Sequence, residues 1–133
     1  MEKVVEICCG GYEDALAAYR GGAKRIELNS ALYLGGLTPS VGTLLLTKQH
    51  TDLKVIAMVR PRGAGFCYGD ADFAVMQADA EQMMKNGADG IAFGCLDKEA
   101  GLHEAQIRAI VEIVKRYHGE AVFHRAFDCV SDQ

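Results

Sequence analysis

Short apolar stretches alternate with longer stretches in which apolar residues recur at helical spacing, and this alternation constrains the fold most. Residues 55–59 are the clearest strand, because all five are apolar and the run ends in Arg60-Pro61. Further strands are expected at residues 4–8, 25–28, 90–94 and 121–125. Strands that recur about every 20–35 residues with a helix between them indicate βα units and a parallel sheet.

The intervening segments predict four helices. The first ends at Gly21-Gly22, where glycine permits a left-handed cap. The second is expected to start with Thr38 as N-cap and Pro39 at the first helical position, and Asp70 is expected to cap the third. Four βα units and a fifth strand make about half of a (β/α)₈ barrel, which typically has about 250 residues. The predicted fold is therefore α/β, a TIM-type barrel, with residues 1–133 as a single partial domain whose strands run 1-2-3-4-5 with right-handed crossovers.

The overall composition excludes several classes of protein. Half of the residues are hydrophobic and 24% are charged, which is ordinary for a soluble globular protein. The net charge is −4 and no basic stripe occurs, so nucleic acid is not the expected partner. No apolar run approaches the roughly 20 residues that span a membrane, and residues 1–6 lack the layout of a signal peptide. A cytoplasmic location follows as the expectation, with the five cysteines as reduced thiols.

Charged side chains share the strand face opposite to the face that packs on helices. Glu6, Glu27, Arg60 and His124 all have this inward parity. A buried charge costs several kcal/mol unless it is paired, so these groups are expected to meet near the top of the barrel. Two carboxylates, an arginine and a histidine in one place can perform acid–base catalysis, and Asp128 after the last strand is a further catalytic candidate. A buried structural ion network is the open alternative.

Two arginines follow the strand at 55–59, in the sequence Arg60-Pro61-Arg62-Gly63. Pro61 removes a backbone donor and stops the strand. Ligands of α/β proteins bind outside the carboxyl ends of parallel strands. Two guanidinium groups there, with Arg125 as a third, indicate a small anionic ligand, either a carboxylate or a phosphate. The alternative is that an arginine merely pairs with a neighbouring acid.

All five cysteines lie where the expected strands end, on the side where a barrel keeps its site. Cys8 and Cys9 end the first strand, and Cys67, Cys95 and Cys129 follow later ones. Soft thiolates select Cu(I) or zinc. However, no Cys-x-x-Cys pair is present, and free cysteine is usually a small buried hydrophobe. A metal site and simple packing therefore both remain open.

Several short motifs run in order along the chain: Glu6-Ile7-Cys8, residues 21–28, 35–40, 60–63, 66–68, 87–90, 93–94 and 123–128. With these motifs the chain resembles the copper-homeostasis protein family CutC. Arg-Pro-Arg-Gly at 60–63 and Phe-His-Arg-Ala-Phe-Asp at 123–128 are its most specific strings. The resemblance implies a cytoplasmic TIM-type barrel associated with copper handling, with Cu(I) bound by cysteines. The candidate ligands in this chain are Cys8, Cys9 and Cys67.

The chain departs from the family pattern in two ways. Asn29 stands where the family usually carries cysteine, so a copper site shared with Cys8 loses one of its two ligands; Cys9, Cys67 and Cys95 are the substitutes. The later strands and helices of the family are also absent from these 133 residues. A half barrel exposes two sheet edges and apolar surface, so either the sequence is a fragment or two chains complete each other as a homo-oligomer.

Two functional classes therefore stay open. The first is a Cu(I)-binding protein of copper homeostasis, as the resemblance implies. The second is a barrel enzyme that acts on a small anion, held by Arg60, Arg62 and Arg125, with acid–base groups among the carboxylates and His124. A truncated product without activity is the third alternative.

Overall fold

A five-stranded parallel sheet forms the centre of the structure, a computed structural model that describes residues 2–131. The strands are β1 (Ile7–Cys9), β2 (Arg25–Leu28), β3 (Lys54–Met58), β4 (Gly90–Phe93) and β5 (Glu120–Phe123). They lie side by side in the order β1-β2-β3-β4-β5, and each pair is parallel. This confirms the predicted α/β fold and the predicted strand order.

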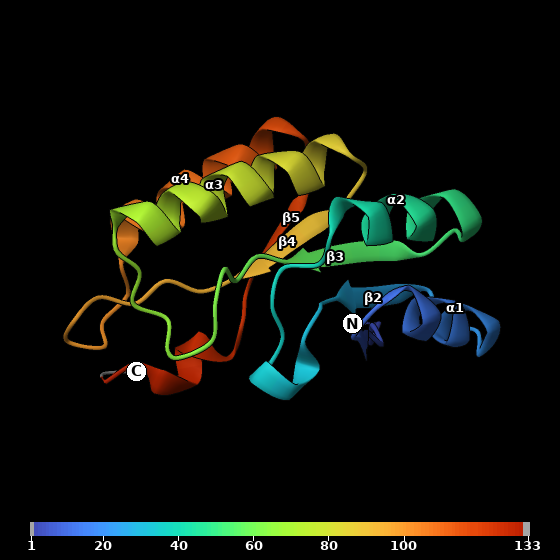
Figure 1. Ribbon diagram of the computed structural model, residues 1–133, viewed down its shortest axis with the longest axis horizontal. Helices are drawn as coiled ribbons and strands as arrows, with labels where there is room; N and C mark the ends of the chain where they lie inside the picture. Colours follow the sequence, from blue (N-terminus) through green and yellow to red (C-terminus); the bar gives the residue numbers. More distant parts are fainter. Residues whose placement is uncertain (1, 132–133) are drawn as a thin grey trace.

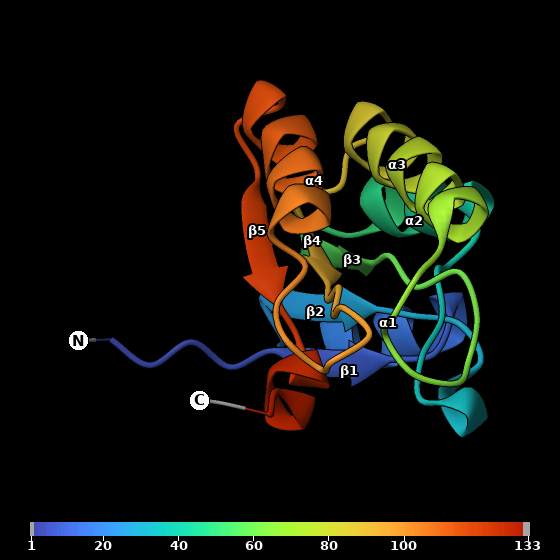
Figure 2. The same cartoon turned by 90° about the vertical axis from the view of Figure 1, so that its left-hand side faces the viewer.

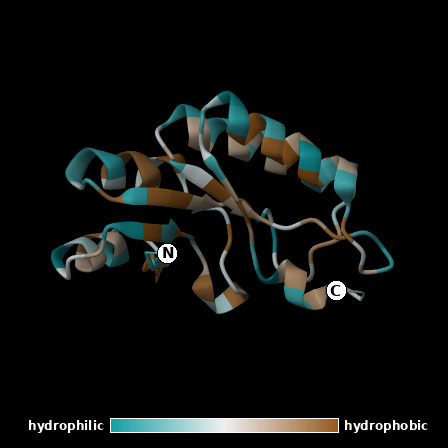
Figure 3. Ribbon diagram, turned by 180° about the vertical axis from the view of Figure 1, so that it is seen from behind, coloured by the Kyte–Doolittle hydropathy of each residue, from teal (hydrophilic) through white to brown (hydrophobic). Residues whose placement is uncertain are grey.

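The α-helices cover one face of the sheet, and the sheet curves away from them (Figures 1 and 2). They are α1 (Tyr12–Arg20), α2 (Val41–His50), α3 (Asp70–Lys85) and α4 (Glu104–Arg116), with short 3-10 helices η1 (Leu32–Leu34) and η2 (Arg125–Cys129). Figure 3 shows hydrophobic and hydrophilic patches alternating along these helices, as expected for amphipathic helices that pack by one face. The arrangement is that of consecutive βα units in an open part of a TIM-type barrel.

The two faces of the sheet carry two different hydrophobic clusters. Ile26 and Leu28 are fully buried in the large cluster between sheet and helices, as their parity predicted. The uncovered face carries a smaller cluster of residues with the opposite parity, made by Ile56, Met58 and Ala92 with Val122 packed against them. The second face corresponds to the interior of a barrel. Side chains that share its parity and lie at the carboxyl ends of the strands therefore point towards the place where a barrel binds its ligand.

Two predicted helix starts are shifted, several predicted strand bounds differ by one or two residues, and the start of the first predicted strand differs by three. Ser40, not Thr38, is the N-cap of α2, and its Oγ accepts from the Thr43 N–H at 3.1 Å. The residue before α3 is Gly69, so Asp70 is the first helical residue and not the cap. Strand β1 starts at Ile7, which pairs with Ile26 of β2, its one neighbouring strand within residues 2–131.

Residues 2–6, before β1, have no strand partner among residues 2–131. Val4 and Val5 are both 72% exposed. Strands β1 and β5 each pair on one side only. No helix within residues 2–131 is long and apolar enough to cross a membrane.

Candidate functional site

A cavity of about 220 Å³ lies at the carboxyl ends of the strands, on the face away from the helices. Its lining residues are Cys8, Glu27, Gly35, Met58, Arg60, Phe66, His124 and Arg125. Cys8 and Glu27 are paired in the register of β1 and β2. Arg60 is the second residue after β3, and His124 is the first residue after β5. The structure thus brings together Glu27, Arg60 and His124, as their shared parity predicted, and adds Arg125 and Cys8.

The guanidinium of Arg60 is buried without a counter-ion. The residue is 4% exposed, and its Nη1 donates to the carbonyl oxygens of Leu34 (2.8 Å) and Gly36 (3.2 Å). Its Nε has no hydrogen-bond partner, and none of the ion pairs within residues 2–131 includes it. A buried charge and a buried donor left without partners are both costly. The guanidinium of Arg60 therefore lacks an acceptor at Nε.

The imidazole of His124 supplies a second unpartnered donor. Burial, together with the nearby charges of Arg60 and Arg125, lowers the pKa of His124 to about 4, so the ring is neutral at pH 7. Its Nδ1 accepts from the Ala126 N–H at 3.1 Å, so the proton of the neutral ring sits on Nε2. That Nε2 is buried and has no hydrogen-bond partner. His124 can therefore donate to a ligand without adding charge.

Phe66 organises the positive wall of the cavity. The guanidinium carbons of Arg60 and Arg125 lie 5.2 and 5.9 Å from its ring centroid, and the His124 ring lies 5.1 Å away. Cation–π contacts of this kind offset part of the cost of placing two arginines together. Gly35 makes room for both arginines, because its φ is +88° and an added Cβ would collide with Arg125 Nη2. Arg125 Nη2 also donates to the Gly35 carbonyl at 3.4 Å.

The wall that β1 and β2 contribute to the cavity carries a thiol and a carboxylate. Asn29 is 1% exposed, and its Nδ2 donates to Glu27 Oε1 at 3.1 Å and lies 3.6 Å from Cys8 Sγ. Burial, and after it the charges of Glu27, Glu6 and Asp14, raise the pKa of the Cys8 thiol. Cys8 is therefore a neutral thiol at pH 7, and Glu27 is the acceptor of this wall.

Glu6 does not join the cavity. It pairs with Arg25, which also pairs with Glu120, and Glu120 in turn pairs with Lys54. These residues stand at or just before the first residues of their strands, so the cluster lies at the amino ends. Strand parity placed Glu6 on the correct face but could not give its height along the strand. For Glu6, the structural ion network that the sequence left open is what the structure shows.

Arg62 and Asp128 also lie outside the cavity lining. Arg62 Nε donates to Asp72 at 2.8 Å, its Nη2 donates to the Cys67 carbonyl at 2.9 Å, and its guanidinium lies 5.0 Å from the Tyr68 ring centroid. Arg62 thus pairs with a neighbouring acid and holds its own loop in place. Asp128 is exposed in η2.

The cysteines do not assemble into a metal site. Cys9 faces the helices, and burial raises its pKa to about 11, while burial of Cys95 raises its pKa to about 12. Cys67 is exposed and does not line the cavity. Within residues 2–131 no group of three or more His, Cys, Asp or Glu side chains could hold a metal ion. Cys8 alone lines the cavity, so these residues do not fit a two-thiolate Cu(I) site.

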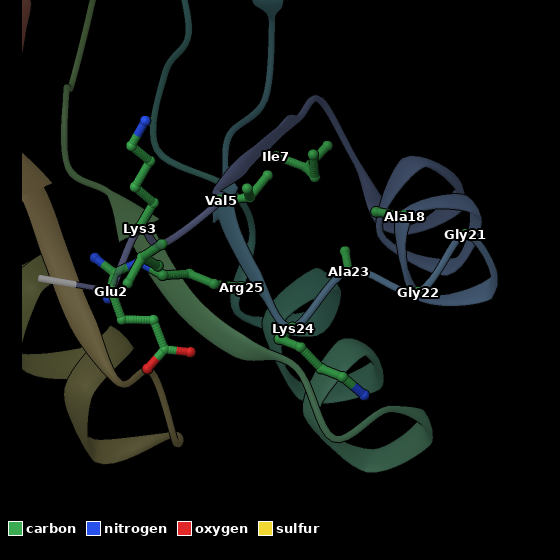
Figure 4. A pocket seen from close by; sticks show the side chains of 11 residues that line it. Glu2, Lys3, Val5, Ile7, Ala18, Gly21, Gly22, Ala23, Lys24 and Arg25 are labelled. Atoms are coloured by element: carbon green, nitrogen blue, oxygen red, sulfur yellow. The ribbon is translucent and has the colours of Figure 1, made fainter.

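A larger cavity of about 640 Å³ lies elsewhere, between the N-terminal segment, β1, α1 and the turn before β2 (Figure 4). Its lining residues include Lys3, Val5, Ile7 and Gly22. None of the buried unpartnered polar atoms found within residues 2–131 belongs to this lining. The smaller cavity is therefore the candidate site despite its size.

Sequence reasoning did not assign a role to Gly35, Met58 or Phe66. Phe66 lies in the glycine-rich loop after Arg60, and its membership of the motif at 66–68 was a further signal for it. Gly35 comes from the segment around η1, 90 residues away from its partner Arg125 in the sequence. Only the folded chain brings these segments together.

Parallel strands with helices on one face and a cavity at the carboxyl ends define the class: a barrel-type α/β protein with a cavity at the end of the sheet where barrel proteins bind their ligands. The CutC family model matches residues 3–133, and the chain belongs to the CutC family. A CutC family protein of Treponema denticola is 50% identical over 128 residues. The human copper homeostasis protein cutC homolog is 41% identical over 129 residues.

These alignments cover 96% and 97% of this chain but 51% and 46% of the relatives, so the chain spans about half the length of the curated relatives it matches. Among solved structures, the putative copper homeostasis protein CutC of Streptococcus agalactiae superposes with a TM-score of 0.88 at 26% identity, covering 97% of this chain and 62% of that one. Oxaloacetate acetylhydrolase superposes with a TM-score of 0.61 at 13% identity, over 91% of this chain and 47% of that one, which reflects the fold alone.

Proposed function

We propose that the cavity at the carboxyl ends of the strands binds a small anion through Arg60, Arg125 and His124. The observation that carries the proposal is that two residues lining one cavity, Arg60 and His124, each hold a buried donor without a partner, Nε and Nε2. Buried polar groups in native proteins normally have partners, so two unpartnered donors on residues of one cavity lining point to a ligand acceptor. The uncompensated charge of Arg60 favours an anionic acceptor, as a carboxylate or phosphate provides.

Glu27 is the residue that would give such a site acid–base capacity. It is the one carboxylate that lines the cavity, and Asn29 fixes its position through Oε1. A carboxylate beside a bound anion can take up or return a proton of that ligand. We propose this role for Glu27 in an enzyme of the family, with Arg60 and Arg125 holding the substrate.

The test is a calorimetric titration of the purified chain with inorganic phosphate and with malonate at constant ionic strength. Arg60→Gln should weaken binding at least about tenfold, because it removes the buried charge. Arg108→Gln is the matched control, since Arg108 is exposed on α4 and should leave binding unchanged. Equal affinity of wild type and Arg60→Gln for both anions would refute the proposal.

Cu(I) binding is a second candidate function, which the name of the human relative favours. Cys8 is the thiol that lines the cavity, and the side chain at position 29 reaches to within 3.6 Å of its Sγ. A single thiol is an incomplete ligand set for Cu(I). We propose that this chain binds Cu(I) through Cys8, more weakly than relatives that have a second cysteine, and that it does so in the reducing cytoplasm.

Competition with a Cu(I) chelator tests this second proposal. Asn29→Cys supplies the second thiol and should raise the affinity at least about tenfold. Cys8→Ser should remove binding, and Cys129→Ser, an exposed cysteine in η2, is the control. Unchanged affinity in Cys8→Ser would exclude Cys8 as a ligand.

A further inference from the structure

We infer that the anion of this cavity is a small hydroxycarboxylate, whose carboxylate faces Arg60 and His124 and whose hydroxyl donates to Glu27. The inference rests on the proposed function and adds the class of ligand. It depends on the chemical difference between the two walls of the cavity.

The cavity is small enough for one ligand to touch both walls. Its volume of about 220 Å³ lies below the roughly 300–1,000 Å³ of cavities that hold drug-sized ligands. A cavity of this size suits a small molecule such as a short carboxylic acid with one further substituent. The donor wall is formed by Arg60, Arg125 and His124, and the acceptor wall by Glu27.

Glu27 has capacity left for a ligand. Asn29 Nδ2 is the hydrogen-bond donor to its Oε1, and the ion pairs within residues 2–131 do not include Glu27. The carboxylate of a ligand placed against Glu27 would be repelled, so the acidic end of the ligand turns to the donor wall. The opposite end then faces an acceptor, which is satisfied by a donor such as a hydroxyl group.

The charge of the cavity distinguishes a hydroxyl from an ammonium group. Two guanidinium groups face a single carboxylate, because His124 is neutral and Cys8 is a neutral thiol. The lining therefore carries one net positive charge. A hydroxycarboxylate has the matching single negative charge, whereas an amino acid is a zwitterion without net charge.

The experiment compares three probes on one carbon skeleton: lactate, propionate and alanine. Each is titrated into the purified chain at pH 7 and constant ionic strength, with binding followed by NMR. Lactate should bind at least about tenfold more tightly than propionate, because the hydroxyl adds a hydrogen bond to a charged group. Alanine should bind more weakly than lactate.

Substitution of Glu27 should change the affinities for lactate and propionate in opposite directions, which loss of folding cannot do. Glu27→Met should lower the affinity for lactate and raise the affinity for propionate, because the repulsion and the acceptor disappear together. Glu6→Gln, the matched change at the other end of the strands, should leave both affinities as they are.

The outcomes separate this inference from the function on which it rests. If lactate and propionate bind wild type equally and Arg60→Gln weakens both, the inferred ligand class is refuted. The proposed anion-binding function is then retained. Tighter binding of alanine than of lactate would also refute the inferred ligand class. Binding of none of the probes, together with no binding of phosphate or malonate, would overturn both.

Discussion

Thr38 forms hydrogen bonds with both the backbone N–H and the backbone carbonyl of Arg60. The Arg60 N–H donates to Thr38 Oγ1 at 2.9 Å, that hydroxyl donates to the Arg60 carbonyl at 3.1 Å, and the Thr38 N–H donates to the same carbonyl at 3.1 Å. Arg60 lies just beyond β3, so the ladder of the sheet no longer fixes its backbone. Thr38 replaces the ladder at this point and thereby positions the guanidinium at the cavity. This is also why Thr38 is not available as the cap of α2.

Replacing Thr38 by valine should therefore affect stability and anion binding together. Thr38→Val removes the hydroxyl from a half-buried site and leaves the Arg60 N–H without its acceptor, at an expected cost of about 1–3 kcal/mol in the free energy of unfolding. Thr38→Ser keeps the hydroxyl and should recover most of that loss. Urea denaturation and phosphate titration of both variants measure the two effects, and wild-type anion affinity in Thr38→Val would contradict the positioning role.

Gly35 and Gly22 offer a matched pair of substitutions. Both have positive φ, +88° and +90°, so alanine at either position should destabilise the fold by about 1 kcal/mol. A Cβ at Gly22 meets no atom within 4 Å, whereas a Cβ at Gly35 collides with Arg125 Nη2 and crowds Arg60 Nη1. Gly35→Ala should therefore weaken anion binding and Gly22→Ala should not. Similar anion affinities in the two variants would show that the close approach of the arginines to Gly35 is not needed.

The buried neutral His124 should make stability depend on pH. Its pKa is about 4 in the folded chain and about 6.5 when exposed, so between these values the unfolded chain binds more protons. Its contribution is fully present above about pH 6.5 and is lost as the pH falls towards 4. From pH 6.5 to about pH 5 the free energy of unfolding should drop by about 2 kcal/mol.

Urea denaturation at several pH values measures this slope. His124→Gln should flatten it between about pH 5 and pH 6.5. His50→Gln is the control, because His50 is exposed at the end of α2 and should leave the slope unchanged. A slope that persists in His124→Gln would assign the dependence to another group.

The ion cluster at the amino ends should act on stability alone. Glu6→Gln removes one partner of Arg25, which keeps Glu120, so a loss of about 1 kcal/mol or less is expected. The affinity of the cavity for phosphate should stay at the wild-type value, because Glu6 is not among its lining residues. Weaker phosphate binding in a folded Glu6→Gln chain would show that Glu6 does contribute to anion binding.

The 133-residue chain on its own is expected to self-associate. Within residues 2–131, strands β1 and β5 each have one unpaired edge, and three apolar residues, Val4 and Val5 before β1 and Ile7 in it, are exposed. Open edges with apolar surface favour pairing with another chain. Sedimentation velocity at several concentrations measures the association, and Val5→Lys should reduce it. A stable monomer with a sharp cooperative melting transition would contradict this expectation.

The sequence by itself determined the succession of elements and the face to which each strand residue points. The apolar run at 55–59 and the glycine-ended helices predicted parallel βα units, because hydrophobic periodicity and backbone freedom are local properties. The period of two along a strand correctly turned Ile26 and Leu28 towards the helices and Arg60 and His124 away from them.

The tertiary structure alone decided which of the inward-facing charges meet. Glu6 and Glu27 share the same parity, yet one pairs with Arg25 at the amino ends and the other lines the cavity. Likewise Arg62 forms an ion pair with Asp72. Arg60 has no carboxylate partner within residues 2–131 and lies over the Phe66 ring. Height along a strand and the path of a loop depend on strand register and on contacts between segments far apart in the sequence. A local pattern contains no information on such contacts.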